Sequence, residues 1–309
     1  MPASVMIEPD LAAMSHYRDC VLPFSLDRHA RGRIVRLDAA LDQIIHQHAY
    51  PRAVAQLLAE LVTLAVTLAA ALKYDGVFTL QVKGDGPIRL MVADVTSQGA
   101  LRGYAQFDPA HFAEDWPADT PLPRLTGRGY LAFTVDQGDF TDRYQGIVEL
   151  EGSSLSECLH HYFRTSEQLE ASFAIAAERT EGGWRSGGLM IQRLPLPSSP
   201  KYPLEEDEEQ WRQSVVFMAS ARRAELLDPG LAMEDILRRL FHDFAVRVYP
   251  AHSVRAQCRC SDERVRTILL SLDAEERKEM AVDGVVTVTC EFCNRTYRYT
   301  PAELEGDKE

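Results

Sequence analysis

The C-terminal part of the sequence carries two tight cysteine pairs, in CRCSDERV at residues 258–265 and in VVTVTCEFCNRTYRY at residues 285–299. One residue separates the cysteines of the first pair, two separate those of the second, and 29 residues lie between the pairs. Four thiolates can give a zinc ion a closed tetrahedral site with Zn–S distances of about 2.3 Å. The pattern therefore indicates metal or redox chemistry.

Short structural elements are expected around both pairs. Two strands flank the turn of the second pair, with strand, turn and strand at residues 285–289, 290–293 and 295–299. Two short helices are expected at residues 262–272 and 274–280. Ser261 can cap the first helix. Asp273 and Glu276 form a capping box for the second.

This C-terminal unit has few residues for a hydrophobic core. The apolar candidates are Val265, Ile268, Leu269, Leu272, Met280, Val282, Val285, Val286 and Val288. A unit of about fifty residues with so small a core is marginal on its own, so metal must supply much of its stability. Structural zinc contributes about 10–16 kcal/mol of coupled folding free energy in small peptides. Losing it would unfold the unit.

Oxidation and metal binding compete for the same sulfurs. Peroxide and hypochlorous acid attack thiolates, and cysteines separated by one or two residues can also join as local disulfides. The alternative is a purely structural zinc site with no switching role, which is common for closed sites of four cysteines.

The composition is that of a soluble globular protein, with 46% hydrophobic and 26% charged residues among 309. The net charge of -13 disfavours sequence-independent binding to nucleic acid, which needs clustered Lys and Arg. Six cysteines are too few for a disulfide scaffold. No secretory leader opens the chain, so a cytoplasmic location is expected.

An α+β core domain of antiparallel strands and helices is expected over residues 1–200. A first strand is expected at residues 31–37. From Gly76 on, alternating hydrophobicity and tight turns predict an antiparallel meander, with strands at residues 76–82, 88–95, 101–107, 129–135 and 144–150. Asp38 can cap a short helix that runs toward His48. Helical spacing is expected at 155–163 and through 166–178, followed by a hairpin into 189–194 that Gly182-Gly183 and Gly187-Gly188 bracket.

A long Ala-rich helix begins after Pro51 and continues through an apolar stretch at residues 53–72. Gln56 and the carboxylate of Glu60 interrupt this stretch, and no second segment of this kind accompanies it. We therefore expect a buried core helix and no membrane span.

The Pro-rich stretch PLPSSPKYP at residues 195–203 marks a domain boundary, because its four prolines cannot continue a helix or a central strand. Beyond it, helices are expected at 211–226 and 233–244. They carry many charges, so we assign residues 201–257 to a metastable, charged helical linker and residues 258–309 to a zinc-binding domain.

The sequence resembles the heat-shock protein 33 family, the redox-regulated bacterial chaperones also called 33 kDa chaperonins. The resemblance covers roughly residues 24–300 and includes more than the cysteines. The matching segments include LKYDGVFTLQVKGDGPIRLMVADV at 72–95, SLSECLHHYFRTSEQL at 154–169, FHDFAVRVY at 241–249, CRCSDERV at 258–265 and MAVDGVVTVTCEFCNRTYRY at 280–299.

The resemblance implies that Cys258, Cys260, Cys290 and Cys293 bind one Zn²⁺ per chain in a reduced, inactive form. It also implies that oxidation joins Cys258 to Cys260 and Cys290 to Cys293 while zinc leaves. The active protein would then be a stress-response holdase for unfolded or oxidatively damaged client proteins, and a homodimer. It would be no enzyme and need no ATP, since the Gly84-Asp85-Gly86-Pro87 turn lacks the lysine of a phosphate loop.

Two other function classes remain open on the residues alone. A thiol-disulfide oxidoreductase also uses a C-x-x-C pair, but it places that pair before a helix, whereas here a strand follows. A zinc-ribbon nucleic-acid binder would use the local arginines, which are Arg255, Arg259, Arg264, Arg266 and Arg295. We assign no site to the isolated Cys20 and Cys158, to His160-His161, or to the acidic run 205–209.

Overall fold

The computed structural model describes residues 18–112, 116–137, 144–165, 169–195 and 204–304. The chain divides into two compact units, Met1–Ala256 and Gln257–Glu309, and each is considered by itself. Most of the Pro-rich stretch expected at the first boundary, residues 196–203, lies outside the described residues. The helices that follow it belong to the first unit, and the metastability assigned to them stays a prediction.

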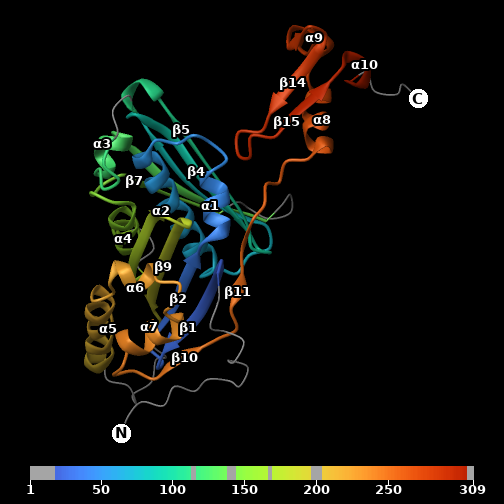
Figure 1. Cartoon of the computed structure of the whole chain (residues 1–309). Helices are drawn as coiled ribbons and strands as arrows, with labels where there is room; N and C mark the ends of the chain where they lie inside the picture. The colour runs from blue at the N-terminus through green and yellow to red at the C-terminus, as the bar shows by residue number, and fades with distance from the viewer. Residues whose placement is uncertain (1–17, 113–115, 138–143, 166–168, 196–203, 305–309) are drawn as a thin grey trace. The chain divides into compact units, whose positions relative to one another are not determined.

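Two antiparallel sheets build the first unit (Figure 1). The first sheet has the order β10-β1-β2-β9-β8, with β11 also pairing β1. Its strands are β1 Cys20–Leu26, β2 Ala30–Leu37, β8 Ala171–Thr180, β9 Gly183–Arg193, β10 Val246–Val248 and β11 His252–Ser253.

The second sheet has the order β12-β5-β4-β3-β6-β7, in which the short β12 runs parallel to β5. Its strands are β3 Val77–Gly84, β4 Ile88–Thr96, β5 Ala100–Phe107, β6 Gly129–Asp136, β7 Tyr144–Glu149 and β12 Arg255–Ala256. The strands predicted for the meander are confirmed as β3 to β7, and the separate strand predicted at residues 31–37 is β2 of the first sheet. The α+β class is confirmed too.

The helix α2, Arg52–Ala69, lies between the two sheets and contacts strands of both. It is long and apolar enough to cross a membrane, but 89% of this apolar segment is buried within the protein. That burial confirms the predicted core helix. Gln56 donates a hydrogen bond to Glu60 at 2.8 Å, and burial raises the pKa of that carboxyl.

The remaining helices of this unit range from 4 to 16 residues in length. They are α1 Ala39–Ile45, η2 Pro109–Phe112, α3 Leu122–Thr126, α4 Leu155–Thr165, α5 Leu204–Ala219, α6 Arg223–Leu227 and α7 Met233–Leu240. The predicted short helix after Asp38 is confirmed as α1, but the Asp38 side chain does not cap it. The carboxylate of Asp19 accepts the backbone N–H groups of Asp38 and Ala40 instead, at 2.7 and 3.1 Å.

The prediction of a simple meander is wrong in one respect, because β6 pairs with β3 and not with β5.

The turn after β3 holds the returning chain in place. Asp85 N–H donates to the carbonyl of Arg128, and Gly86 N–H donates to that of Thr126 at 2.8 Å. A Cβ at Gly86 would lie 2.5 Å from the nitrogen of Gly127, so this close approach requires glycine.

The helix predicted to continue through residue 178 is also wrong: β8 occupies its described C-terminal part, while 166–168 lie outside the described residues. β8 pairs with β9 over its whole length. Phe173, Ile175 and Ala177 alternate along β8 and pack in the α2 core. The predicted hairpin is confirmed, but Gly187 and Gly188 lie inside β9 rather than bracketing it.

The helices α5, α6 and α7 cover the face of the first sheet opposite α2 (Figure 1). The sheet contributes Leu22, Phe24, Ile34, Leu189 and Ile191 to this second core. The helices and the segment after them contribute Trp211, Met218, Leu226, Leu227, Met233, Ile236, Leu237, Leu240, Phe241 and Phe244. The two predicted linker helices are thus present as three, and their apolar faces are buried.

Polar contacts also join this helical layer to the sheet, and two of them involve Asp207 and His29. Asp207, inside the acidic run, is buried and pairs with Arg193 of β9. His29 is buried at the β1–β2 turn, and its Nε2 lies 2.8 Å from Ser214 Oγ. Because the Ser214 hydroxyl donates to the carbonyl of Gln210, Nε2 carries the proton in this bond.

The other ring nitrogen of His29, Nδ1, is buried and has no hydrogen-bond partner among the described residues. Burial lowers the pKa of His29, and Arg193 lowers it further, while Asp27 and Asp207 oppose the shift. A proton on Nδ1 would therefore be buried without an acceptor. The docked helical layer favours neutral His29.

This geometry predicts an acid-sensitive layer. The folded pKa of His29 is below its ordinary 6.5, so the unfolded state binds more protons and stability falls as pH drops below 6.5. The loss is at most about 1.4 kcal/mol per pH unit. His29→Gln, which keeps a donor toward Ser214, should flatten the pH dependence of the thermal midpoint between pH 5 and 7.5.

The matched control is His242→Gln, since His242 is exposed in the same helical layer. That variant should keep the wild-type slope. Equal slopes in wild type and His29→Gln would contradict the role of His29.

Candidate metal centre

The second unit is a small arrangement of short helices and a three-stranded sheet. Its elements are α8 Asp262–Ser271, α9 Ala274–Glu279, β13 Ala281–Val282, β14 Val285–Thr289, β15 Thr296–Tyr299 and α10 Pro301–Leu304. Ser261 accepts the N–H of Arg264, which confirms its predicted cap. The capping box of Asp273 and Glu276 is also present.

The core of this unit is smaller than the sequence suggested. Its buried residues are Leu269, Val286, Tyr297, Tyr299 and Leu304. The predicted core residues Ile268 and Val282 are 63% and 74% exposed, and Met280 is exposed too. The two tyrosines were missed, although their alternation in TYRY of β15 is the ordinary sign of a strand with one buried face.

The second cysteine pair lies in a tight turn between β14 and β15. Asn294 has φ of +57°, a left-handed conformation that asparagine tolerates better than most residues. Its N–H donates to the carbonyl of Cys290 at 2.8 Å, and the N–H of Cys290 donates to that of Arg295 at 2.9 Å. These bonds fix the turn that carries Cys290 and Cys293.

All four sulfurs of the two pairs meet in one place and lie within 4.8 Å of one another. Two close approaches run between the pairs: Cys258 Sγ to Cys290 Sγ is 3.7 Å, and Cys260 Sγ to Cys293 Sγ is 3.4 Å. Sulfurs bound to one tetrahedral zinc ion would lie about 3.8 Å apart, whereas a disulfide needs about 2.05 Å. The reduced cluster therefore fits a metal ion of zinc's size.

The hydroxyl of Tyr297 donates to Cys260 Sγ at 3.2 Å. Burial raises the pKa of Cys260, but this bond and bonds from the three other thiols outweigh burial and lower the pKa to about 7. Burial, together with bonds to the other sulfurs, raises the pKa of Cys293 to about 12. The cluster thus holds one thiolate readily, and a cation is needed to hold four.

The isolated cysteines have no such environment. Cys20 and Cys158 are buried and unpaired with any second cysteine. Burial raises the pKa of Cys20 to about 12 and that of Cys158 to about 11, which leaves both as unreactive thiols. Within the described ranges, the four clustered cysteines are the one group of three or more ligating side chains close enough for a metal.

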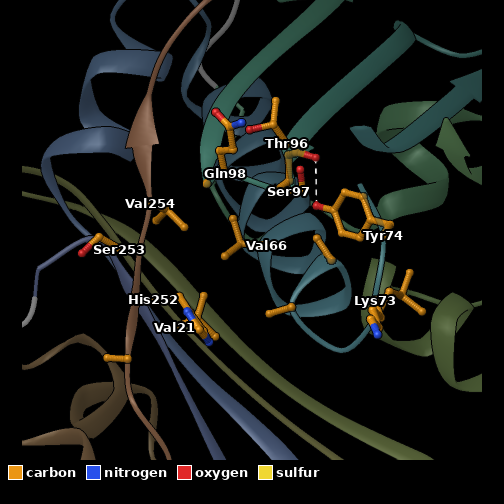
Figure 2. Close-up of a pocket in the computed structure, with 16 residues that line it drawn as sticks. Val21, Val66, Lys73, Tyr74, Thr96, Ser97, Gln98, His252, Ser253 and Val254 are labelled. Carbon is orange, nitrogen blue, oxygen red and sulfur yellow. Dashed lines mark hydrogen bonds between the residues drawn. The ribbon is translucent and has the colours of Figure 1, made fainter. Parts of the chain in front are cut away.

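The first unit also contains a pocket of about 540 Å³ between the end of α2, the β4–β5 turn and β11 (Figure 2). Figure 2 shows Tyr74 at its edge, where its hydroxyl donates to the carbonyl of Val95. The Ser97 hydroxyl donates to Asp75 Oδ1 at 3.2 Å. Ser97 therefore stabilises the turn beside the pocket.

Comparison with known proteins identifies the chain's relatives. The family model described as Hsp33 protein matches residues 19–300. The 33 kDa chaperonin of Caulobacter vibrioides (strain NA1000 / CB15N) is 36% identical over 303 residues, which cover 96% of this chain and 98% of the relative. The 33 kDa chaperonin of Pseudomonas fluorescens (strain SBW25) is 35% identical, with 90% and 89% covered.

The fold has a solved counterpart in the crystal structure of the 33 kDa chaperonin from Thermotoga maritima. The TM-score is 0.76 at 24% identity, and the match covers 93% of this chain and 97% of that chain. At this identity the likeness supports the fold alone. The family match and the full-length relatives, together with the four clustered cysteines, show that this chain belongs to the Hsp33 family of chaperones.

Proposed function

We propose that the protein is an ATP-independent holdase, zinc-bound and inactive when reduced, which oxidative stress activates through disulfide formation and zinc release. Active protein would bind unfolding clients in the cytoplasm and prevent their aggregation. The observation that supports this most is the cluster of four sulfurs within 4.8 Å, in a unit with five buried core residues.

Zinc bound at this cluster would supply four bonds that join the Cys258–Cys260 segment to the β14–β15 turn. The protein's own contribution is positioning. The turn hydrogen bonds of Cys290 set one pair of sulfurs, and Tyr297 holds Cys260. With so little apolar burial to replace these bonds, loss of the ion would unfold this unit.

Oxidation would remove the ligands. Each disulfide forms as two thiols lose two protons and two electrons, and peroxide takes up both to give water. The family resemblance assigns the pairs Cys258–Cys260 and Cys290–Cys293. A sulfur engaged in a disulfide no longer offers a thiolate, so zinc would leave as the bonds form.

The client-binding surface would come from the first unit. The strands β10, β11 and β12 carry the chain without a break from α7 to Ala256, two residues before Cys258. We infer that unfolding of the zinc unit loosens this segment and then the helical layer α5–α7. The face beneath, with Leu22, Phe24, Ile34, Leu189 and Ile191, would then be exposed to clients.

The proposal extends to partners and location. We expect a homodimer after oxidation and no binding to nucleic acid or membrane. The excess of acidic residues supports the absence of nucleic-acid binding, because phosphate contacts need a basic surface. No geometry favours a thiol-disulfide oxidoreductase, since the strand β15 and not a helix follows the C-x-x-C pair.

The first test compares the reduced, zinc-loaded protein with the same protein after peroxide. We expect suppression of aggregation of a heat-unfolding client only after oxidation, with zinc release followed by a chromogenic chelator over the same time. Peptide mapping of the oxidised protein should find the two local disulfides. Equal suppression by both forms would contradict the switch, and insulin reduction without holdase activity would favour an oxidoreductase.

The second test removes one ligand. Cys260→Ser should lower the zinc content of the reduced protein and unfold the second unit, so that part of the holdase activity appears without oxidant. Cys158→Ala is the control, because Cys158 is buried far from the cluster in sequence and should leave zinc stoichiometry unchanged. A Cys260→Ser protein that keeps its zinc and stays inactive until oxidised would rule out the ligand role.

The third test concerns Tyr297. Tyr297→Phe removes the hydrogen bond to Cys260 and should weaken zinc binding about 10- to 100-fold in a chelator competition. Tyr299→Phe is a matched control: its hydroxyl donates to Asp262, at 3.0 Å from Oδ1, and not to a sulfur. If both variants bound zinc equally well, Tyr297 would have no role in holding the metal.

A further inference from the structure

The strand β8 forms one edge of the first sheet and is exceptional in length for an edge. It runs over ten residues, Ala171–Thr180, and pairs with β9 on one side. Among the described residues, no strand pairs with its other side. A long edge of this kind presents backbone N–H and C=O groups to any extended segment that reaches it.

The register of the hairpin identifies which groups point outward. A two-residue turn joins Thr180 to Gly183, and the residues that flank such a turn form a hydrogen-bonded pair. Even-numbered residues of β8 therefore direct their N–H and C=O groups toward β9. Odd-numbered residues direct theirs to the free edge.

Side chains from other elements confirm this alternation by bonding odd-numbered groups. His160 of α4 makes two hydrogen bonds: its Nδ1–H donates to the Ala171 carbonyl at 3.1 Å, and its Nε2 accepts from the Phe173 N–H at 3.3 Å. It thereby takes the place of one residue of a neighbouring strand. The carbonyl of Ala177 accepts from Gln56 at 2.8 Å and also from Arg223.

Ile175 lies between the groups that His160 bonds, at Ala171 and Phe173, and the bonded carbonyl of Ala177. Its outward N–H and C=O groups have no partner in the part of the chain that the structure describes. The side chains that bond this edge come from different parts of the unit. His160 and Gln56 belong to core helices, whereas Arg223 belongs to α6 of the helical layer that the proposed function releases.

The surface beside this edge is apolar and could contact apolar side chains of a partner. Ala174 and Ala176 face the helical layer, next to Leu189 and Ile191 of β9. Once α5–α7 leave, an added strand would direct every second side chain to this same face, beside Ala174 and Ala176. Backbone pairing supplies affinity regardless of side-chain sequence, as a binder of many unfolded chains requires.

We propose that the free edge of β8, from Ile175 to Arg179, captures an extended apolar segment of an unfolded client as an additional strand of the first sheet. Arg223 and Gln56 share the carbonyl of Ala177, and release of the helical layer would remove the bond from Arg223. The inference rests on the proposed holdase function and deepens it, because it states how the client is held.

Hydrogen exchange at single residues tests the pairing directly. The probe client is reduced, carboxymethylated α-lactalbumin, which stays unfolded and has no free thiols. In the oxidised protein, the amides of Ile175 and Ala177 should exchange at least about tenfold more slowly when the client is present. The amides of Ala174 and Ala176, already bonded to β9, should change little.

A proline variant tests the function of the edge. Arg179 is exposed, and its N–H points outward, so Arg179→Pro removes an edge donor without breaking the ladder to β9. It should weaken probe binding by the oxidised protein about tenfold, roughly the loss of one backbone hydrogen bond. Arg179→Ala controls for the lost side chain and should bind as the wild type does.

The outcomes separate this inference from the proposed function. If oxidised wild type binds the probe and exposes α5–α7 amides, but Ile175 and Ala177 gain no protection, edge capture is wrong and the holdase proposal stands. Unweakened binding by Arg179→Pro likewise overturns edge capture. If oxidised wild type binds no probe at all, the holdase proposal fails first.

Discussion

The close meeting of four cysteine sulfurs is the constraint on which the rest of the molecule depends. Thiols within 4.8 Å of one another cannot all ionise without a cation, because each thiolate repels the next. The unit around them buries five core residues, too few to hold the sulfurs together against that repulsion. Under the proposed function, zinc bound by the reduced sulfurs would keep the second unit folded, and oxidation would remove that support.

The helical layer of the first unit has a different balance. Its apolar side chains, from Trp211 to Phe244, are buried against the sheet and supply part of its stability. Its polar contacts depend on the charge state of side chains and on the position of the helices. His29 must stay neutral, Asp207 must stay paired with Arg193, and Arg223 reaches over the edge of β8. Under the proposed function, loss of these contacts would favour release of the layer while the sheet beneath stays intact.

Local sequence signals predicted the local features and missed those that depend on distant segments. The caps at Ser261 and Asp273 and the turn of the second pair follow from neighbouring residues. The strand β8 was mistaken for a helix because a short Ala-rich segment fits both periods, and pairing with β9 decides between them. The Asp19 cap and the bond from Tyr297 to Cys260 join residues 19 or more positions apart, which periodicity cannot reveal.

The connectivity of the disulfides determines whether oxidation opens the second unit or locks it. The observed approaches, Cys258 to Cys290 and Cys260 to Cys293, join residues 32 and 33 positions apart. A disulfide that closes a loop of this length stabilises a fold by roughly 3–4 kcal/mol in the chain-entropy account, so cross-linking between the pairs would take over the role of the metal. Local bonds within each pair close loops of a few residues and restrict the unfolded chain far less. A switch that opens on oxidation therefore needs the local pairing, and sulfurs now placed for metal binding must rearrange to form it.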